Sequence, residues 1–578
     1  MKKVIFFFSL LVCVTMQTLA QFANYRNYFS PPIDTVLLLS GNFGELRANH
    51  LHSGIDIKVF EQEGLPVLAA ADGFIVRVKV SPVGFGKALY IDHPNGFTSV
   101  YGHLQRFNNT INAYVKEEQY KRESFELDVF PGKDRFLVKK GDTIGYAGNS
   151  GSSFGPHLHF EIRDTYTERP INPLYFNFPI KDTIAPAINL LRIYPFNDSS
   201  FVNNSNSPMD FIISKDSLYK PELIEGDTIQ LAGSIGFGIE TYDYIYNKND
   251  KSGIYSMQLF IDSVLCFYCT ADSFAFDETR YANSLIDYNY WMKTGIRVYR
   301  TYIQPENKLS LYDYVYNSGI FSFCDNLLHS IRIEVADFNG NTAQLAFTVR
   351  GKLPYHDLIN LPYCNEDVGF FIPEKDNIFE NENISIFFPK GCLYDTLHFS
   401  YASEHIPKGC FSALHCIHNV FTPLHKNILV RIKVIGLPSK YINKTHIVKI
   451  QENGDKITCG GEWENGYIKT KIVQFGNYSV VVDTIPPIIK VLNLSKRKYL
   501  KTQKTLEFEI KDSSSGIKTY RGTINGHWIL MDYDAKNDKL IYFIDEKIVM
   551  ESNKFKLVVT DNCNNIRIFS TQLYYNKK

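Results

Sequence analysis

The sequence carries no excess charge of either sign, because its 61 lysines and arginines equal its 61 aspartates and glutamates. Nucleic-acid binders normally have a basic excess, so this balance argues against that class. Methionine is scarce, with 7 residues against 37 tyrosines and 43 phenylalanines, and the aromatic excess favours strands over helices. The 44% of apolar residues argues against a disordered chain, and the length of 578 residues predicts about three to five domains.

Cysteine is absent from residues 21–265, although nine cysteines follow. This distribution excludes the dense disulfide framework of a small secreted scaffold, but a few bridges, for example between Cys410 and Cys416, stay open. Cys266 and Cys269 form a CxxC pattern. Residues three apart on a strand face opposite sides, so ordinary burial of these two is favoured over metal or redox use.

Long apolar runs are absent after the first 20 residues. The N-terminus itself begins with Met1-Lys2-Lys3, continues with an apolar run over residues 4–14 and reaches a small residue at Ala20. This is the layout of a secretory signal peptide, and the run is too short to span a bilayer comfortably. We therefore expect residues 1–20 to be removed. The mature chain is expected beyond the cytoplasmic membrane, in the periplasm, the cell envelope or the medium, with no transmembrane segment.

The pattern of strands and turns predicts a mainly β, multidomain protein. Residues 21–178 are rich in glycine turns and short alternating strands. Within them, a segment at about 108–136 is dense in Glu, Lys and Gln and predicts a helical insertion between two strands. Residues 351–482 hold further alternating strands and predict a β-sandwich of unknown role. His415 and His418 lie near two cysteines there, but scattered strand residues are favoured over a metal site.

Residues 179–350 and 483–578 repeat one another. Asp182-Thr183-Ile184 matches Asp483-Thr484-Ile485, and the segment from Asp337 matches that from Asp561, in the same order. Alternating strands bounded by turns predict an immunoglobulin-like sandwich for each, resembling modules common in bacterial surface proteins. The turn Asn249-Asp250-Lys251 could bind calcium, although solvated turn residues are the favoured interpretation.

Residues able to bind a metal are concentrated in the first section. His52 and Asp56 stand four apart, and His157 and His159 stand two apart. In an extended segment an even spacing puts both side chains of a pair on one face. Imidazole and carboxylate are good zinc ligands, and a catalytic zinc takes three protein ligands and keeps one position open. With His103 there are five candidates for three places, which leaves two histidines for acid–base work.

These motifs together resemble the lysostaphin/LytM-type zinc metallopeptidases, whereas an isolated HxH would more often be incidental. The resemblance covers about residues 40–176 and says nothing about residues 180–578. The order and approximate spacing agree in four stretches: His52-Ser53-Gly54-Ile55-Asp56, Tyr101-Gly102-His103, Gly148-Asn149-Ser150-Gly151 and Gly155-Pro156-His157-Leu158-His159-Phe160-Glu161-Ile162.

The resemblance implies a compact, mainly antiparallel β-domain with a groove over a Zn²⁺ ion. It implies His52, Asp56 and His159 as zinc ligands, and His103 and His157 as catalytic histidines, with His157 favoured as the general base. Three further residues are given no chemical role. Glu161 is expected to be structural, His50 lacks the four-residue step to Asp56, and His93 is expected at the surface because it lies in a Pro-Asn-Gly turn.

The leading hypothesis is an exported zinc metalloendopeptidase that hydrolyses the peptide part of peptidoglycan. A non-enzyme alternative is a LytM-type scaffold or regulator that binds wall peptides or activates another hydrolase. Regulators of that kind often lack zinc ligands, and here none is missing. A third possibility keeps the enzyme but gives it a glycine-rich or other extracellular protein as substrate. The β-modules could then hold a partner protein of the cell envelope.

Overall fold

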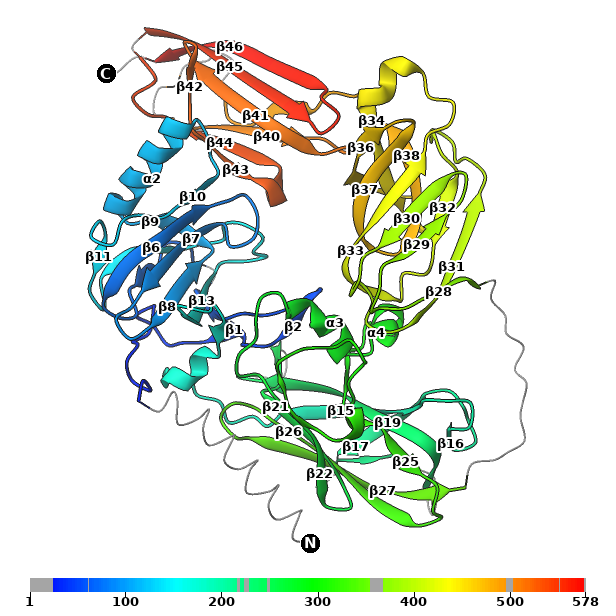
Figure 1. Cartoon of the computed structure of the whole chain (residues 1–578). Helices are drawn as coiled ribbons and strands as arrows, with labels where there is room; N and C mark the ends of the chain where they lie inside the picture. The colour runs from blue at the N-terminus through cyan, green and yellow to red at the C-terminus, as the bar shows by residue number, and fades with distance from the viewer. Residues whose placement is uncertain are drawn as a thin grey trace. The chain divides into compact units, whose positions relative to one another are not determined.

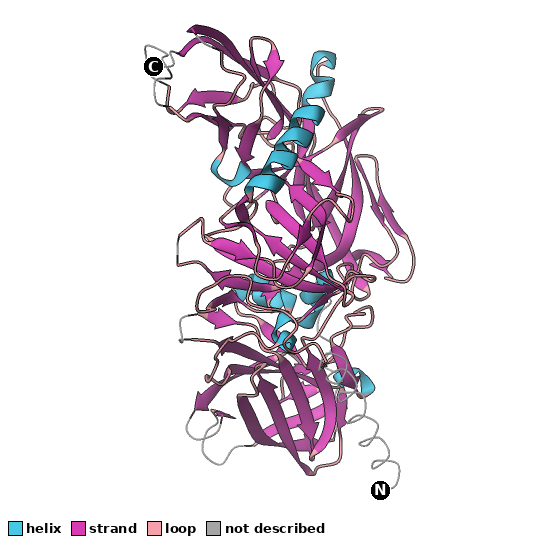
Figure 2. Cartoon of the chain, turned by 90° about the vertical axis from the view of Figure 1, so that its left-hand side faces the viewer, coloured by secondary structure: helices cyan, strands magenta, loops and turns pink. Residues whose placement is uncertain are grey.

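The computed structural model describes residues 24–575 except 61, 216–218, 223–227, 247–249, 354–366, 495–499, 501, 502 and 550. The predicted signal peptide and Cys364 lie outside the described residues. Strands dominate every part of the chain, as Figure 2 shows, and this confirms the prediction of a mainly β, multidomain protein. The chain divides into two compact units. Unit 1 comprises residues 1–118, 126–282 and 309–354, and unit 2 comprises residues 119–125, 283–308 and 355–578.

The N-terminal part of unit 1 is built on one antiparallel sheet (Figure 1). Its strands follow the order β1 (Leu39–Gly41), β4 (Ile55–Lys58), β13 (His157–Asp164), β8 (Phe97–Gly102), β7 (Lys87–Asp92), β6 (Gly73–Val80) and β10 (Leu127–Val129), with β11 (Leu137–Val138) beside β6 and β14 (Pro170–Ile171) beside β13. Two smaller groups are β5 (Pro66–Leu68), β12 (Thr143–Ala147) and β9 (Leu104–Phe107), and the hairpin of β2 (Leu46–Arg47) and β3 (His50–Leu51).

Alternation of side chains explains why this sheet forms a core. Ile55 and Ile57 of β4, and Leu158 and Phe160 of β13, are fully buried, as their spacing predicts. The helix α2 (Asn109–Arg122) lies within the segment predicted as a helical insertion, and Leu127–Val129 returns to the sheet as β10. No helix of the described residues is long and apolar enough to cross a membrane.

The second part of unit 1 is a β-domain wrapped around the long strand β19 (Ile229–Tyr244). One stretch of β19 pairs antiparallel with β15, and residues 229–232 pair in parallel with β27. The strand order is β16 (Phe201–Val202), β19, β15 (Ala187–Pro195), β17 (Met209–Lys215), β18 (Tyr219–Pro221), β27 (Thr342–Lys352), β26 (Leu328–Ala336), β21 (Ser256–Ile261), β22 (Val264–Thr270) and β24 (Tyr312–Val315), with β20 (Lys251–Ser252) and β25 (Phe321–Phe323) also on β19.

Unit 2 contains two further pairs of antiparallel sheets, each pair around its own core. The first pair is β28 (Asp367–Phe371), β31 (Leu397–Glu404), β32 (Leu414–Ile417), β38 (Gly476–Val482), β34 (Thr445–Ile450) and β35 (Lys456–Gly460) against β29 (Asn377–Glu380), β30 (Ile384–Phe388), β33 (Pro423–Lys433), β37 (Tyr467–Gln474) and β36 (Glu462–Glu464). The second pair is β39 (Ile488–Val491), β40 (Thr505–Lys511), β44 (Lys539–Phe543) and β43 (Met531–Asp534) against β42 (His527–Trp528), β41 (Ile517–Ile524), β45 (Glu551–Asp561) and β46 (Ile566–Tyr575).

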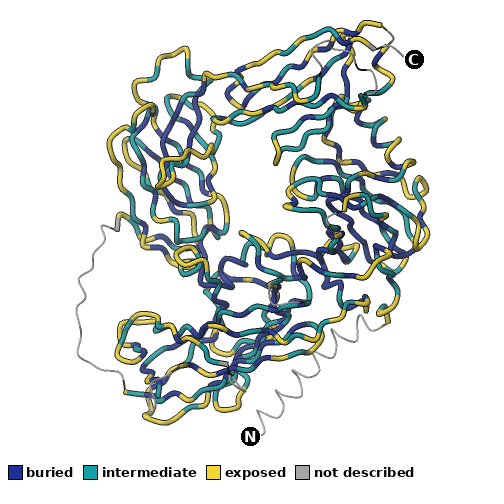
Figure 3. Tube along the Cα trace, turned by 180° about the vertical axis from the view of Figure 1, so that it is seen from behind, coloured by how far each residue is buried: buried dark blue, intermediate teal, exposed yellow. Residues whose placement is uncertain are grey.

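Further short elements are α3 (Ala282–Leu285), α4 (Tyr288–Thr294) and β23 (Val298–Arg300). Figure 3 shows buried residues concentrated in the interior of the chain trace and exposed residues at many of its outer bends. The eight cysteines of the described residues are free thiols, so the bridge considered between Cys410 and Cys416 does not form in this structure.

Candidate metal and catalytic site

Three neighbouring strands of the first sheet, β4, β13 and β8, bring the predicted metal-binding residues together. His159 on β13 stands opposite Asp56 on β4 and opposite Gly102 at the end of β8. His103 follows Gly102 directly, so β8 delivers it to the same place. Antiparallel pairing therefore joins motifs that lie about a hundred residues apart in the sequence.

His52 reaches the site from the turn between β3 and β4. This turn approaches β13 so closely that a side-chain carbon at Gly54 would overlap the backbone oxygen of Phe160. Glycine is required where two backbones meet in this way. This turn, rather than the single extended segment expected from the four-residue spacing, brings His52 beside Asp56.

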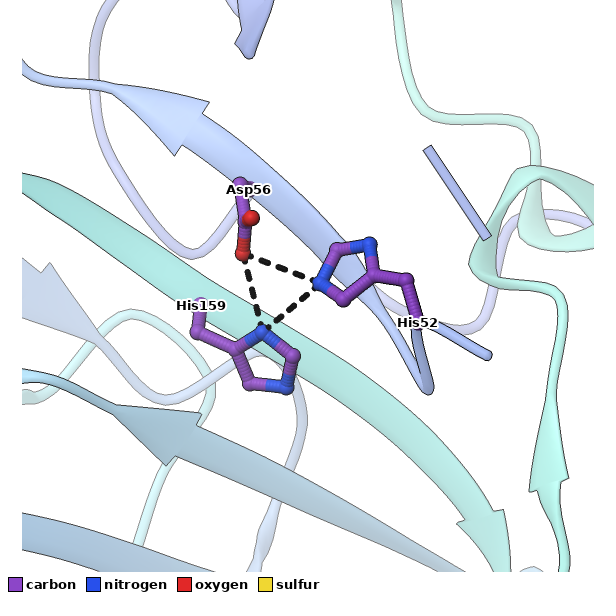
Figure 4. A group of neighbouring side chains, drawn as sticks. All are labelled: His52, Asp56 and His159. Carbon is purple, nitrogen blue, oxygen red and sulfur yellow. Dashed lines mark hydrogen bonds and ion pairs between the residues drawn. The ribbon is translucent and has the colours of Figure 1, made fainter. Parts of the chain in front are cut away.

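Three donor atoms from His52, Asp56 and His159 meet at one point (Figure 4). The His52 Nε2 atom lies 3.1 Å from Asp56 Oδ1 and 3.0 Å from His159 Nδ1, and the latter two atoms are 2.9 Å apart. All three side chains are buried. Donors around a tetrahedral zinc lie roughly 3.3 Å apart, so two imidazoles and a carboxylate at these separations fit such an ion.

His103 and His157 lie beside this group, and each of them directs its Nε2 atom toward it while its Nδ1 atom contacts the backbone. The Nδ1 atoms are 2.8 Å from the Ser150 carbonyl and 2.9 Å from the Gly155 carbonyl, respectively. Both Nδ1 atoms are therefore assigned as N–H donors, which leaves a lone pair on each Nε2 of the neutral rings. The Nε2 of His157 has no hydrogen-bond partner among the described residues and lies 3.4 Å from Asp56 Oδ1.

The backbone at His103 is itself unusual. Its φ of 58° lies in the left-handed region, which costs energy in a non-glycine residue and is often found at functional sites. The Phe85 carbonyl accepts the His103 backbone N–H at 2.8 Å, and the Phe85 ring stacks on His159 with 4.7 Å between ring centroids. Phe85 thus supports both histidines.

A buried shell of hydrogen bonds orients the three donor residues. Glu161 accepts the His159 Nε2–H at 2.8 Å and also contacts Ser53 and Arg163. The Asn42 carbonyl lies 2.8 Å from His52 Nδ1. Such partners fix the tautomer of a ligating histidine and direct its other nitrogen to the metal.

Arg47 supplies a charged partner for the remaining oxygen of Asp56. Its guanidinium donates to Asp56 Oδ2 at 2.5 Å, while Oδ1 of the same carboxylate points to the histidines. A charge-assisted hydrogen bond of this kind fixes the orientation of the carboxylate. Arg47 lies on β2, so the β2–β3 hairpin contributes directly to the site.

The site's electrostatics favour a cation. Burial would raise the pKa of Asp56, but its interactions with His52 and His159 hold that pKa well below its usual range. Burial would lower the pKa of His159, but hydrogen bonds to Asp56 and Glu161 raise it to about 9. The carboxylates that favour a proton on His159 would equally favour a divalent ion, which displaces such protons on binding.

Two further histidines of the site, His52 and His103, are held neutral. Burial lowers the pKa of His52 and outweighs the opposing effect of Asp56. Burial, followed by electrostatic interaction with the neighbouring His159, lowers the pKa of His103 to about 3. A neutral ring is the form that can bind a metal or accept a proton.

One expectation near the site is wrong. His93 is buried rather than on the surface, with Nδ1 2.8 Å from the Asp72 carbonyl and Nε2 2.7 Å from Ser99 Oγ. The Phe29 ring packs edge-on against it and covers the turn. His50, in contrast, is exposed and its Nδ1 contacts the Ala48 carbonyl, away from the three donors.

Fold and side-chain geometry together define a candidate metal site in an antiparallel β-domain, and the comparisons with known proteins identify that domain. A family model described as "Peptidase family M23" matches residues 50–120 and 129–173. A second model, described as "Zu5-like domain", matches residues 369–483. The N-terminal part of the chain is therefore a peptidase M23 domain of the LytM/lysostaphin type, which confirms the resemblance. The section predicted as a β-sandwich of unknown role contains the Zu5-like match.

Individual relatives match about a quarter of this chain. The DD-carboxypeptidase/endopeptidase Mpg of Neisseria meningitidis is 33% identical over 22% of this chain and 23% of its own length. The peptidoglycan DD-endopeptidase ShyA of Vibrio cholerae is 28% identical over 26% and 30%, respectively. A zinc-containing peptidase structure from Vibrio cholerae is 25% identical over 26% of this chain and 40% of that chain, with a TM-score of 0.20. The chain thus spans about a quarter of the length of these curated relatives.

Proposed function

We propose that this protein is an exported zinc metalloendopeptidase that hydrolyses peptide bonds in the peptide part of peptidoglycan. The observation that carries the proposal is the meeting of His52, Asp56 and His159 at 2.9–3.1 Å, with the Nε2 lone pairs of two more histidines beside them. The substrate class is supported by the names of the relatives, which include peptidoglycan DD-endopeptidases. Export is supported by the predicted signal peptide.

In this proposal His52, Asp56 and His159 hold the zinc. When bound, zinc supplies Lewis-acid chemistry that activates water and polarises a carbonyl. His157 acts as the general base, because its Nδ1 is held by the Gly155 carbonyl and its Nε2 is left available. His103 is held in the same way by the Ser150 carbonyl, so its Nε2 serves the opposite proton transfer or stabilises the developing oxyanion once protonated.

The protein's own groups then account for a complete proton cycle. A proton taken from water by one histidine can pass to the departing amine, which needs a donor to leave as a neutral group. The rings of His103 and His157 lie 4.8 Å apart between centroids, so both can serve one scissile bond. Glu161, Asn42 and Arg47 act as positioning residues, since each contacts a donor residue and not the space beside the two catalytic histidines.

The proposal is tested by incubating zinc-loaded protein with purified sacculi and with defined cross-linked muropeptides. Products are analysed by mass spectrometry. We expect hydrolysis of a peptide bond by the wild type and by His50→Ala, since His50 is exposed and points away. His157→Ala should keep its zinc but lose at least about 100-fold in rate, the usual contribution of a general base. A zinc-loaded wild type that binds wall peptides without cutting them would instead support a scaffold. If the protein cleaved a glycine-rich protein but no muropeptide, the proposed substrate class would be wrong and the proposed peptidase activity would stand.

A further inference from the structure

The second part of unit 1 contains another cluster of side chains of a type that binds metals. It consists of three carboxylates and, unlike the first site, contains no histidine. Asp182, Asp243 and Asp337 each offer a carboxylate oxygen within 4.8 Å of the other two. Asp182 precedes β15, Asp243 lies near the end of β19 and Asp337 directly follows β26. Three separate segments therefore direct negative charge at one point.

The cluster has no balancing cation. Among the residues that the structure describes, no lysine or arginine forms an ion pair with any of the three carboxylates. Asp243 and Asp337 are only 2% and 3% exposed, so these charges are withheld from water. Burying unpaired carboxylates side by side is strongly unfavourable unless a cation or protons neutralise them.

One oxygen in the cluster lacks any partner. The Oδ1 atom of Asp243 is buried and accepts no hydrogen bond from the described residues. Its neighbours are better satisfied: Asp182 Oδ1 accepts the Ile184 backbone N–H at 3.0 Å, and Asp337 accepts both the backbone and side-chain N–H of Asn341. Burial, and then the charges of Asp182 and Asp337, raise the pKa of Asp243 to about 8.

The C-terminal repeat provides an internal comparison. Asp483 and Asp561 make the same local bonds as Asp182 and Asp337, to Ile485 and Asn565 respectively, and Asp512 completes a similar cluster. The Oδ1 atom of Asp512, however, accepts hydrogen bonds from the backbone N–H groups of residues 514–516 at 2.8–3.2 Å. The hydroxyl of Ser515 also donates to Asp483 at 2.6 Å. The unsatisfied oxygen is thus particular to the first copy.

We propose that Asp182, Asp243 and Asp337 bind a divalent cation of the calcium type. Carboxylate oxygens are the ligands that Ca²⁺ prefers, at about 2.3–2.6 Å, so two ligands of one ion lie at most about 5 Å apart. The observed limit of 4.8 Å meets this condition. A pocket of about 260 Å³ lined by Asp182, Asp243 and Asn339 gives access for the ion and for the waters that would complete its shell.

The position of the pocket gives the cation a structural role. Asn42 and Leu39 of the peptidase domain line the same pocket, so a bound ion would stabilise the joint between that domain and the first β-domain. Arg26 also lines the pocket but forms no ion pair with the three carboxylates among the described residues. A bound cation can contact all three carboxylates at once. We therefore expect the carboxylates to bind such a cation in preference to the Arg26 side chain.

The test uses the full mature chain, loaded with zinc and freed of calcium by passage over a chelating resin. Calcium chloride is titrated to about 10 mM, since extracellular calcium modules bind at about 0.1–1 mM. Binding is followed by equilibrium dialysis with radioactive calcium and by the midpoint of thermal unfolding. Asp243→Asn is the test variant and Asp512→Asn is its matched control in the other repeat.

We expect the wild type and Asp512→Asn to bind a calcium ion that Asp243→Asn does not bind, and to show a rise in midpoint that Asp243→Asn lacks. Without calcium, Asp243→Asn should be at least as stable as the wild type, because a neutral amide replaces a buried carboxyl group whose ionisation is unfavourable beside Asp182 and Asp337. Equal calcium binding by wild type and Asp243→Asn would overturn the proposal. So would a wild type that binds no calcium over the titrated range.

Discussion

At the scale of single residues, Glu161 makes three contacts that hold the donor set in place. It accepts from His159 and Ser53, and it pairs with Arg163 Nη2 at 2.5 Å while fully buried. Glu161→Gln leaves the buried guanidinium without a charged partner, which should cost about 3–5 kcal/mol in the free energy of unfolding. Zinc affinity should fall about 10- to 100-fold, the usual effect of removing such a partner.

Competition with a chromophoric chelator measures that affinity, and thermal unfolding measures the stability. Lys139→Ala, which breaks an ion pair whose lysine side chain is 79% exposed, is the control and should change the stability by less than about 0.5 kcal/mol. Unchanged zinc affinity in Glu161→Gln would show that His159 is oriented by other groups.

The donor residues were accessible from the sequence because each pair lies within one short segment. The spacing of His157 with His159 puts both side chains on one face of β13 through strand alternation. The approach of His52 to Asp56 depends in addition on the turn before β4. Asn42 and Arg47 could not be found in this way, since their contacts with His52 and Asp56 depend on how a turn and a hairpin pack. His93 was misjudged for the same reason: its turn residues predicted exposure, and the packing of Phe29 against it is a tertiary contact.

At the scale of elements, the loop after β1 joins the site to the first β-domain. The Asn42 side chain exchanges two hydrogen bonds with the Gly253 backbone, at 2.6 Å and 3.0 Å, and its own carbonyl contacts His52. Asn42→Ala leaves two buried backbone groups unsatisfied, each at about 1–3 kcal/mol. We expect a lower midpoint of thermal unfolding and weaker zinc binding together. A fall in stability with unchanged zinc affinity would contradict the link between loop and site.

Strand β32 carries a buried histidine that should make unit 2 sensitive to acid. His415 is fully buried, its Nδ1 contacts the Tyr401 hydroxyl at 2.8 Å, and burial lowers its pKa to about 4. Between about pH 4 and pH 6.5 the unfolded chain therefore binds a proton that the folded chain does not. Stability contributed by this group is complete above pH 6.5 and falls as the pH drops to 4, by up to about 3 kcal/mol.

Thermal unfolding from pH 4 to pH 8 tests this dependence. His415→Leu should flatten it, whereas substitution of the exposed His405 by alanine should not. An unchanged slope in His415→Leu would show that other groups cause the acid sensitivity. His415 was considered from the sequence as part of a weak metal cluster. In the structure it lies on a paired strand with Tyr401 as its partner, in keeping with the favoured interpretation of scattered strand residues.

At the scale of the whole molecule, the M23 domain and the first β-domain share one compact unit. Leu51 N–H donates to Thr279 Oγ1 at 2.7 Å, the Phe43 and Phe274 rings lie 5.2 Å apart, and the Asn172 amide donates to the Ala271 carbonyl at 3.0 Å. A fragment of residues 24–178 would expose these groups. We expect it to unfold at a lower temperature than a fragment of residues 24–353, as measured by calorimetry. Equal midpoints would show that the M23 domain is independent.

The architecture of the chain was predictable to different extents along its length. Alternating residues such as Ile55 and Ile57 locate strands and their buried faces, because the period of two is a local property. The parallel pairing of β19 with β27 was not predictable, since it joins residues more than a hundred positions apart without a local signal. The same limit applies to the Asp182, Asp243 and Asp337 cluster, which only the folded chain assembles.

The central claim is that His52, Asp56 and His159 form the metal site of a peptidase. Its most direct test is the zinc content of purified protein, measured by mass spectrometry of the metal alongside hydrolysis of muropeptides. The account predicts about one zinc per chain and activity in the wild type and in His50→Ala, and loss of both in His52→Ala. A His52→Ala protein that kept its zinc and its activity would contradict the account.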